Sequence, residues 1–373
     1  MKIGINARFL LHPYTGIGQY TRCLIPTMAR IEPKHEYFLF APEHVDITLP
    51  ENCHQIRVAE KPYRSDSIRK AHWEHVLVPN EMQRIGVNLA HFLYPSNPRR
   101  KLPMPTVVTV HDVIPWRLSA YRKRIRSKIY HLNARLALKK ADHIITVSEF
   151  SKSEIIKYLK IKEKNIHVIP LAPPLTDNKI SYPDISLRRK FLLYVGGYDE
   201  RKNVPNLIQA YQKHIAPYYP IDLIMVGGKN KGFEELITDE YCARVAEKYP
   251  LKIKGKVIFT DILEQSELAC LYKHALALVH VSMYEGFNLA LVEAMSAGIP
   301  IIASDIPVHH EVTSELALFV DPKNVDSIGI GMHKLINDHA LQQELALKGK
   351  ERSKQFSWEK AAEETLYVYN LFA

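Results

Sequence analysis

The sequence predicts an α/β fold made of two doubly wound domains that face each other across a cleft. Short β-branched runs alternate with helix-length amphipathic segments along most of the chain. The alternation breaks at residues 170–186, where prolines and turn-forming residues crowd together. The chain has 373 residues, which exceeds the usual size of one hydrophobic core. Two domains joined by a linker therefore fit the pattern.

The N-terminal domain is expected to span residues 1–172, and a linker follows at 173–188. Amphipathic helices fit between most of its strands. The expected strands are residues 2–7, 37–41, 55–59, 89–92, 106–112, 143–148 and 166–170.

The C-terminal domain is expected to span residues 189–355. The terminal stretch 356–373 has a helical pattern, and we expect it to pack back across both domains. The strands expected in this half are residues 191–197, 221–228, 256–261, 276–282, 300–305 and 317–322.

Composition points to a cytoplasmic protein. Hydrophobic residues make up 46% of the chain and charged residues 24%. No apolar run approaches the roughly 20 residues that span a bilayer, and the N-terminus lacks the pattern of a signal peptide. The four cysteines show no paired spacing, so free thiols in a reducing compartment are expected.

The net charge of +10 favours an anionic partner, and the densest basic cluster lies at residues 117–128. A solvated helix face explains this cluster. So does contact with an anionic membrane surface or a phosphorylated acceptor, which would place the protein at the cytoplasmic face of the membrane. No nucleic-acid-binding motif accompanies the charge, so nucleic acid is not expected as a partner.

Ligands of parallel α/β sheets bind beyond the carboxyl ends of the strands, so residues at those ends are the first candidates. Gly16 and Gly18 come after the first strand, where backbone amides can meet a phosphate at a helix N-terminus. A plain turn explains them equally well. Thr21 stands where a dinucleotide-binding fingerprint has its third glycine.

A second candidate site is the segment YVGGYDERKN, which contains Gly196, Gly197, Arg201 and Lys202. Arginine offers a planar fork of donors and lysine a compact charge, a combination suited to two neighbouring phosphates. An exposed basic turn is the alternative. Asn203 is placed to cap the helix that follows.

His111 follows an apolar strand of the N-terminal domain. It can bond a substrate hydroxyl or act as an acid or base, and a buried structural histidine is the alternative. Two groups lack a convincing set of further ligands, namely His72 with His75, and His309 with His310 and Glu311. We therefore predict no metal site.

Two carboxylates bracket an apolar segment of the C-terminal domain. Glu285 follows a strand, the next helix is expected to begin near Phe287, and Glu293 then lies on that helix. The amides of Gly286, Phe287 and Asn288 would stabilise an anionic group, while the carboxylates accept hydrogen bonds from hydroxyls. A sugar nucleotide has this shape, with polar rings on both sides of a diphosphate.

The run YEGFNLALVEAMSAGIPIIAS resembles the E-x7-E signature of retaining, family 4 type glycosyltransferases (glycosyl transferases group 1), which have the two-domain GT-B architecture. Further motifs fit the same family over nearly the full length, and the chain most resembles the branch of polysaccharide and lipopolysaccharide mannosyltransferases. These motifs are TGIGQYT, HWEHVLVP, AHFLYPSNP, TVVTVHD, ITVSEFSKSEI, YVGGYDERKN, SDIPVHHEV and FSWEKAAEETLYVY.

The resemblance implies a role for each candidate residue. Glu285 would contact the donor hexose, Glu293 the nucleotide ribose, and Arg201 with Lys202 the diphosphate. His111 would lie near the reacting sugar. The remaining donor-site residues would be Gly16, Gly18, Gly196, Gly197, Gly286, Phe287, Asn288 and Leu289.

The chain departs from the family pattern at two places. Gly197 stands where many members have an arginine, so Arg201 would carry more of the phosphate charge. The chain reads EGFNLA where many members read EGFGLP, so Asn288 and Ala290 would reshape the sugar pocket.

The resemblance implies retaining transfer of a hexose from a nucleotide diphosphate sugar, without a cofactor or a required metal. GDP-mannose is the favoured donor and a UDP-hexose the alternative, and the acceptor would be a saccharide or a lipid-linked saccharide. Two other classes stay open at this point. One is an NAD-dependent oxidoreductase or sugar-nucleotide epimerase, and the other is a non-catalytic, membrane-associated binding protein.

Overall fold

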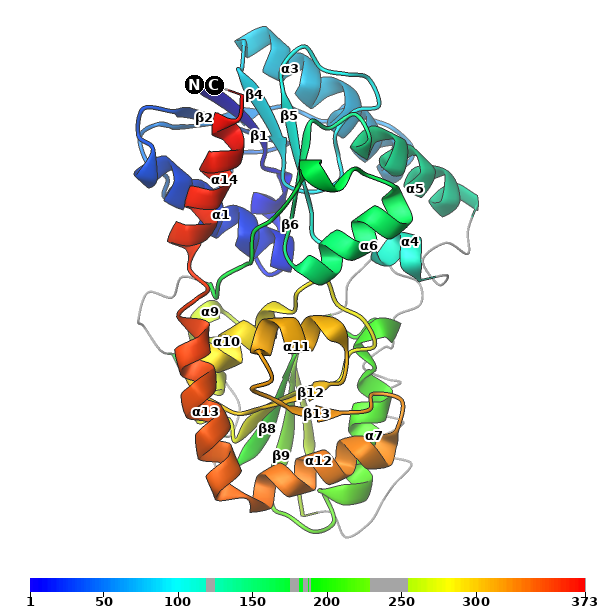
Figure 1. Cartoon of the computed structure of the whole chain (residues 1–373), viewed down its shortest axis with the longest axis vertical. Helices are drawn as coiled ribbons and strands as arrows, with labels where there is room; N and C mark the ends of the chain where they lie inside the picture. Colours follow the sequence, from blue (N-terminus) through cyan, green and yellow to red (C-terminus); the bar gives the residue numbers. More distant parts are fainter. Residues whose placement is uncertain (119–124, 175–180, 184–186, 188, 229–253, 373) are drawn as a thin grey trace. The chain divides into compact units, whose positions relative to one another are not determined.

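The computed structural model describes residues 1–118, 125–174, 181–183, 187, 189–228 and 254–372 (Figure 1). The chain divides into two compact units. The N-terminal unit comprises Met1–Ala172 together with Ser357–Ala373, and the C-terminal unit comprises Pro173–Phe356. Residues 119–124, part of the basic cluster at 117–128, lie outside the described residues, as do most of the expected linker and Cys242.

The N-terminal unit contains a seven-stranded sheet of order β3-β2-β1-β4-β5-β6-β7, and all of its strand pairs are parallel. The strand order reverses beside β1, which is where ligands of such sheets bind. All seven strands predicted for this half are present. They are β1 (Lys2–Asn6), β2 (Glu36–Ala41), β3 (Cys53–Arg57), β4 (Leu89–Phe92), β5 (Thr106–Val110), β6 (His143–Thr146) and β7 (Ile166–Val168).

Helices lie on both faces of this sheet, with α1 and α14 on one face and α3 and α5 on the other (Figure 1). The helix expected at 356–373 is α14, which packs on α1 within the N-terminal unit. The helical elements are η1 (Arg8–Leu11), α1 (Gly16–Ile31), α2 (Asp66–His72), η2 (Trp73–Leu77, a π-helical turn), α3 (Val78–Ile85), α4 (Ile114–Arg117), α5 (Ile125–Leu138), α6 (Glu149–Leu159), η4 (Glu163–Asn165) and α14 (Trp358–Asn370).

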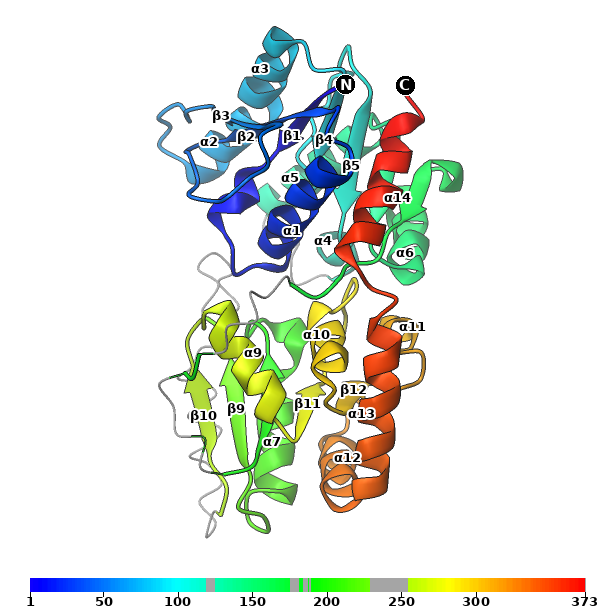
Figure 2. The ribbon, with the colours of Figure 1, turned by 90° about the vertical axis from the view of Figure 1, so that its left-hand side faces the viewer.

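The C-terminal unit repeats this plan with a six-stranded sheet of order β10-β9-β8-β11-β12-β13, again parallel throughout (Figure 2). Here the order reverses between β8 and β11. The six predicted strands are present as β8 (Phe191–Val195), β9 (Asp222–Val226), β10 (Val257–Thr260), β11 (Ala277–His280), β12 (Ile301–Ser304) and β13 (Leu318–Val320). The helical elements are η5 (Glu200–Lys202), α7 (Val204–His214), α9 (Gln265–His274), α10 (Leu289–Ala297), α11 (Pro307–Thr313), α12 (Val325–Asn337) and α13 (His339–Ser353).

Side-chain caps fix the starts of several helices. Thr15, Ser148 and Ser357 accept hydrogen bonds from backbone amides at the starts of α1, α6 and α14. The helices that follow β8 and β11 begin differently. Asn203 before α7 and Asn288 before α10 have left-handed backbones, with φ of 59° and 77°. Their side chains do not cap the helices and are therefore available for other contacts.

The described part of the chain contains no helix that is both long enough and apolar enough to cross a membrane.

Candidate functional site

The turn after β8 brings two cations to the carboxyl end of the C-terminal sheet. A Cβ atom at Gly196 would lie 3.1 Å from the Tyr194 hydroxyl and 3.6 Å from Lys202 Nζ, so glycine lets these groups approach the backbone. The short helix η5 then carries Arg201 and Lys202.

Asn203 connects this turn to the segments that follow β11 and β13. Its amide donates to the carbonyls of Val281, at 3.0 Å, and Pro322, at 2.6 Å. The prediction that the Asn203 side chain caps α7 is therefore wrong, because the amide faces carbonyl groups across the sheet instead of the helix amides.

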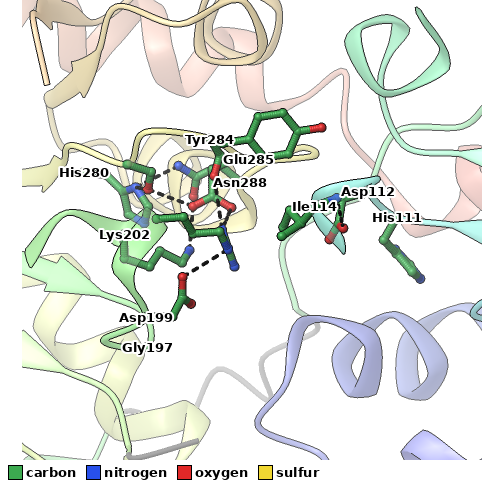
Figure 3. Close-up of polar contacts among 12 residues, drawn as sticks. His111, Asp112, Ile114, Gly197, Asp199, Lys202, His280, Tyr284, Glu285 and Asn288 are labelled. Carbon is green, nitrogen blue, oxygen red and sulfur yellow. Dashed lines mark hydrogen bonds and ion pairs between the residues drawn. The ribbon is translucent and has the colours of Figure 1, made fainter. Parts of the chain in front are cut away.

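Both cations bind the same carboxylate, although Arg201 and Glu285 are 84 positions apart in the chain (Figure 3). Arg201 Nη1 lies 2.5 Å from Glu285 Oε2, and Lys202 Nζ lies 2.7 Å from Glu285 Oε1. Asp199 Oδ1 lies 3.2 Å from Arg201 Nε. The side chain of Glu285 is only 7% exposed, so water screens these contacts weakly. The two cations and two carboxylates form a compact, charge-balanced cluster.

The electrostatics of the cluster keep Glu285 ionised. Burial alone would raise its pKa, but the charges of Arg201 and Lys202 outweigh burial and hold the pKa well below its usual range. Burial lowers the pKa of Lys202, and the nearby Arg201 charge adds to this effect. An entering anion would meet strong, charge-assisted donors here.

Glu285 lies just before α10, but this helix begins at Leu289 with Asn288 as its N-cap, so the predicted start near Phe287 is two residues early. Phe287 is 5% exposed, and its ring packs edge-on against Phe356 at 5.8 Å. The Phe287 side chain is thus part of the packed interior of this unit.

Glu293 lies on α10 in a different environment. The Tyr272 hydroxyl donates to Glu293 Oε2 at 2.6 Å. Burial raises the pKa of Glu293 to about 7, and the Tyr272 hydrogen bond lowers the pKa by a smaller amount. The two predicted carboxylates therefore differ in chemistry, since one is an ion-paired anion and the other takes up a proton near neutrality.

His111 belongs to the N-terminal unit and follows β5. Its Nε2 atom lies 3.0 Å from the Leu93 carbonyl, and its ring meets the Tyr20 ring edge-on at 4.8 Å. Burial lowers the pKa of His111 to about 4, so the ring is neutral at pH 7. Asp112, the next residue, accepts a hydrogen bond from the Ile114 amide and so shapes the turn into α4.

Gly16 and Gly18 start α1 but have different surroundings. The amide of Gly18 donates to the Thr15 hydroxyl at 3.0 Å, and a Cβ atom at Gly18 would lie 1.9 Å from the His12 carbonyl oxygen. A Cβ atom at Gly16 would meet nothing within 4 Å. Close backbone packing therefore explains the glycine at position 18.

Sequence reasoning missed several polar residues of the C-terminal site. Ser282 donates to Glu285 Oε1 at 2.7 Å, and Asp199 and Tyr272 bind Arg201 and Glu293 as described above. Asp199 and Ser282 lie close to the ends of predicted strands, and that position was a usable signal. Within the described residues, no group of three or more histidine, cysteine or acidic side chains is arranged to hold a metal ion.

The chain folds into two doubly wound units with parallel sheets, and the C-terminal unit has a charged cluster at its switch point. These features define the class of the protein. The structure is similar to that of sucrose-phosphate synthase from Thermosynechococcus elongatus, with a TM-score of 0.80 and 21% sequence identity. The likeness covers 100% of this chain and 98% of that chain. This is the GT-B architecture of glycosyltransferases.

Sequence comparison then identifies the family. The family model "Glycosyl transferases group 1" matches residues 177–352, and "Glycosyltransferase Family 4" matches residues 14–172. The chain belongs to this glycosyltransferase family. The match favours the predicted transferase over an oxidoreductase or an epimerase.

Two curated relatives are O-antigen chain mannosyltransferases. Mannosyltransferase B from Escherichia coli is 26% identical, over 100% of both chains. RfbU from Salmonella typhimurium is 30% identical, over 59% of this chain and 58% of the relative.

Proposed function

We propose that this glycosyltransferase transfers a hexose, with mannose favoured, from a nucleotide diphosphate sugar to a hydroxyl, with retention of the anomeric configuration. GDP-mannose is the favoured donor and a UDP-hexose the alternative. The acceptor is a saccharide or lipid-linked saccharide in polysaccharide biosynthesis. The names of both O-antigen relatives support mannose and a polysaccharide product.

The observation that carries this proposal is the convergence of Arg201 and Lys202 on Glu285, beside the start of α10. Transfer requires the bond between the sugar and a diphosphate to break, and the departing diphosphate carries new negative charge. Two cations fixed in a buried site stabilise that charge without having to reorganise during the reaction. They also supply the positive charge that a divalent metal would otherwise provide, so the proposed reaction needs no metal.

The two carboxylates would contact the two other parts of the donor, the hexose and the ribose. Glu285, ionised and held on three sides, would accept hydrogen bonds from the donor hexose and favour positive charge on its ring. Glu293, which has one oxygen bound by Tyr272, would accept a bond from the ribose. His111, neutral at pH 7, would lie near the reacting sugar.

The proposed chemical step takes place on one face of the sugar. The anomeric carbon–oxygen bond breaks and its electron pair leaves with the diphosphate. The acceptor hydroxyl attacks the same face, and its proton passes to an oxygen of the leaving phosphate. This step retains the configuration and needs no covalent nucleophile from the protein.

A thermal-shift panel of nucleotide sugars tests the donor. A donor that binds only the folded state raises the melting temperature, so GDP-mannose should give the largest rise among GDP- and UDP-sugars. Proton NMR of the product then reads the anomeric configuration. An inverted product would contradict retention, and a larger shift with a UDP-hexose would move the donor assignment to that sugar.

Two further proposals need separate tests. Activity should persist after dialysis against EDTA, because Arg201 and Lys202 bear the diphosphate charge.

Peripheral contact with anionic membranes should appear as sedimentation of the protein with phosphatidylglycerol vesicles. This sedimentation should be absent with neutral vesicles.

A further inference from the structure

A buried hydrogen-bond network lies behind Glu285 and includes Asn288, one of the residues at which the sequence departs from the family pattern. Asn288 is 8% exposed, and its Nδ2 atom lies 3.0 Å from His280 Nδ1 (Figure 3). The same Nδ2 atom lies 2.9 Å from His309 Nε2. His280 and His309 are both fully buried. One amide therefore bridges two imidazole rings.

The far side of His309 fixes the direction of these bonds. His309 Nδ1 lies 3.0 Å from the Ser304 carbonyl, which can only accept, so the His309 proton is on Nδ1. Burial lowers the pKa of His309 to about 4, so the ring carries this single proton at pH 7. His309 Nε2 is then an acceptor, and Asn288 turns its NH2 group toward it.

The second hydrogen of this NH2 group points to His280. Because Asn288 Nδ2 can only donate, His280 Nδ1 must accept, and the His280 proton is on Nε2. Burial, together with the Lys202 charge, lowers the pKa of His280 well below its usual value, so this ring is also neutral. Among the described residues, His280 Nε2 has no hydrogen-bond partner in either tautomer, so the contacts at Nδ1 decide the choice.

Ser282 completes the connection to Glu285. Its hydroxyl lies 2.9 Å from His280 Nδ1 and 2.7 Å from Glu285 Oε1, but it has only one proton. If Nδ1 of His280 were unoccupied, it would compete with the carboxylate for that proton. The Asn288 amide fills this acceptor, so the Ser282 proton goes to Glu285.

We propose that Asn288 is a positioning residue for Glu285, which it controls through His280 and the Ser282 hydroxyl. The catalytic consequence rests on the function proposed above for Glu285. A glycine in place of Asn288 would allow the left-handed backbone but could not fill the His280 acceptor. The network thus gives the asparagine of EGFNLA a role that a glycine cannot perform.

Neutron diffraction from the deuterated wild-type protein tests the proton positions directly. We expect deuterium on Nδ1 of His309 and Nε2 of His280, and a Ser282 hydroxyl directed at Glu285. Deuterium on Nδ1 of His280 would overturn the proposal. This measurement does not depend on activity. If the protons lie as expected and no sugar transfer is found, the proposed function fails while the arrangement of the network stands.

A double-mutant cycle tests whether Asn288 acts through Ser282. Asn288→Gly should lower kcat about tenfold or more and change the donor KM less than threefold, because misplacing a catalytic group slows the reaction more than it weakens binding of a donor held elsewhere. In the Ser282→Ala background the same substitution should have almost no further effect on kcat. If the kcat losses of the two single variants multiplied in the double variant, Asn288 and Ser282 would act independently. That result would overturn the proposed route from Asn288 through Ser282 to Glu285.

Lys160→Gly is the matched control, since Lys160 is another non-glycine residue with a left-handed backbone, φ 58°, at the end of α6. Its kcat should equal that of the wild type. A loss in this control as large as that in Asn288→Gly would assign the effect to the backbone and overturn the role of the amide.

Discussion

The two sheets share a topology but end in different chemistry. At the switch point of the C-terminal sheet, two cations and two carboxylates are ion-paired, with Glu285 between Arg201 and Lys202. At the switch point of the N-terminal sheet, Asn6 and Tyr94 form an amide and hydroxyl network. The parallel fold thus supplies two similar positions, and local side chains decide what each can hold.

The N-terminal network also contains a buried acid. The Tyr94 hydroxyl donates to Glu74 at 2.6 Å, and the Lys70 ammonium lies 3.7 Å from the same carboxylate oxygen. Glu74 therefore has a hydroxyl as its short contact, whereas Glu285 has two cations. A carboxylate held by cations is suited to a site for phosphates and sugars, because the same cations can serve an incoming anion.

The largest expected effect comes from Glu285→Gln. Removing one partner of a buried ion pair leaves Arg201 and Lys202 uncompensated, so the free energy of unfolding at pH 7 should fall by about 3 kcal/mol. Transfer should fall about a thousandfold, because the amide neither pairs with the cations nor stabilises a cationic sugar ring. Urea unfolding and initial rates measure these two losses.

Glu74→Gln is the matched change in the N-terminal unit, because an amide oxygen still accepts from Tyr94. The donor affinity of the Glu74→Gln variant should stay within about threefold of the wild-type affinity. A difference of this size is expected for a change outside a binding site. Equal loss of donor affinity in the two variants would remove the contrast between the two sheet ends.

The pH dependence of the Glu285 contribution has a definite sign. The folded-state pKa lies below the ordinary value of 4.5, so the stabilising contribution is fully present above pH 4.5. It is lost as the pH falls through the folded-state pKa. The stability difference between wild type and Glu285→Gln should therefore stay constant from pH 6 to 8 and shrink in acid.

A smaller effect is expected for Lys202→Ala. Hydrogen bonds to charged groups contribute about 1.5–3 kcal/mol, so donor affinity should fall about tenfold to a hundredfold. Lys213→Ala is the control, since Lys213 pairs with Asp326 at 2.6 Å on the exposed surface of the same unit. Isothermal titration with the donor compares the two. Unchanged affinity and turnover in Lys202→Ala would exclude Lys202 from the diphosphate site.

The glycines at the start of α1 give the next contrast. Gly18→Ala places a Cβ atom against the His12 carbonyl and should lower the free energy of unfolding by about 2 kcal/mol, as overpacking does. Gly16→Ala should change it by less than about 0.5 kcal/mol, because the space around Gly16 is open. Thermal unfolding of both variants measures these two stability changes. A stable Gly18→Ala variant would show that the His12 carbonyl can move away.

The sequence predicted the strands well because long apolar runs bounded by turns leave few alternatives. The rule that ligands bind beyond the carboxyl ends of strands also selected Arg201, Lys202 and Glu285 from the sequence alone. The pairing of both cations with Glu285 was not predictable, because it joins residues far apart in the chain through the arrangement of β8 beside β11.

Local backbone geometry explains the two details of the prediction that are wrong. The sequence predicts a helix start near Phe287 because Gly286 is the usual signal of a break, but Asn288 adopts the left-handed conformation and α10 begins after it. The sequence also predicts that Asn203 caps α7, but its amide binds carbonyl groups of other segments. Both errors concern asparagines whose partners are set by tertiary packing.

The smallest expected effect concerns Glu293, because burial disfavours the ionised form of its carboxyl group. Its pKa is raised from 4.5 to about 7, so the folded state binds a proton between these pH values and the unfolded state does not. Stability therefore falls as the pH rises through this window. Glu293→Gln removes the buried charge while keeping an acceptor for Tyr272. It should be more stable than the wild type at pH 8 by about 1–2 kcal/mol, and this gain should vanish at pH 5.

Denaturant unfolding at the two pH values measures this difference, with the exposed Glu43→Gln as the control that should show none. Donor affinity of Glu293→Gln should fall only about threefold to tenfold, because the amide oxygen keeps the Tyr272 bond and the amide NH2 group can donate to a ribose hydroxyl oxygen. A stability gain that is equal at pH 5 and pH 8 would mean that Glu293 titrates as an ordinary solvent-exposed acid. The contrast between an ion-paired Glu285 and a protonatable Glu293 would then be lost, and both carboxylates would bind the donor as anions.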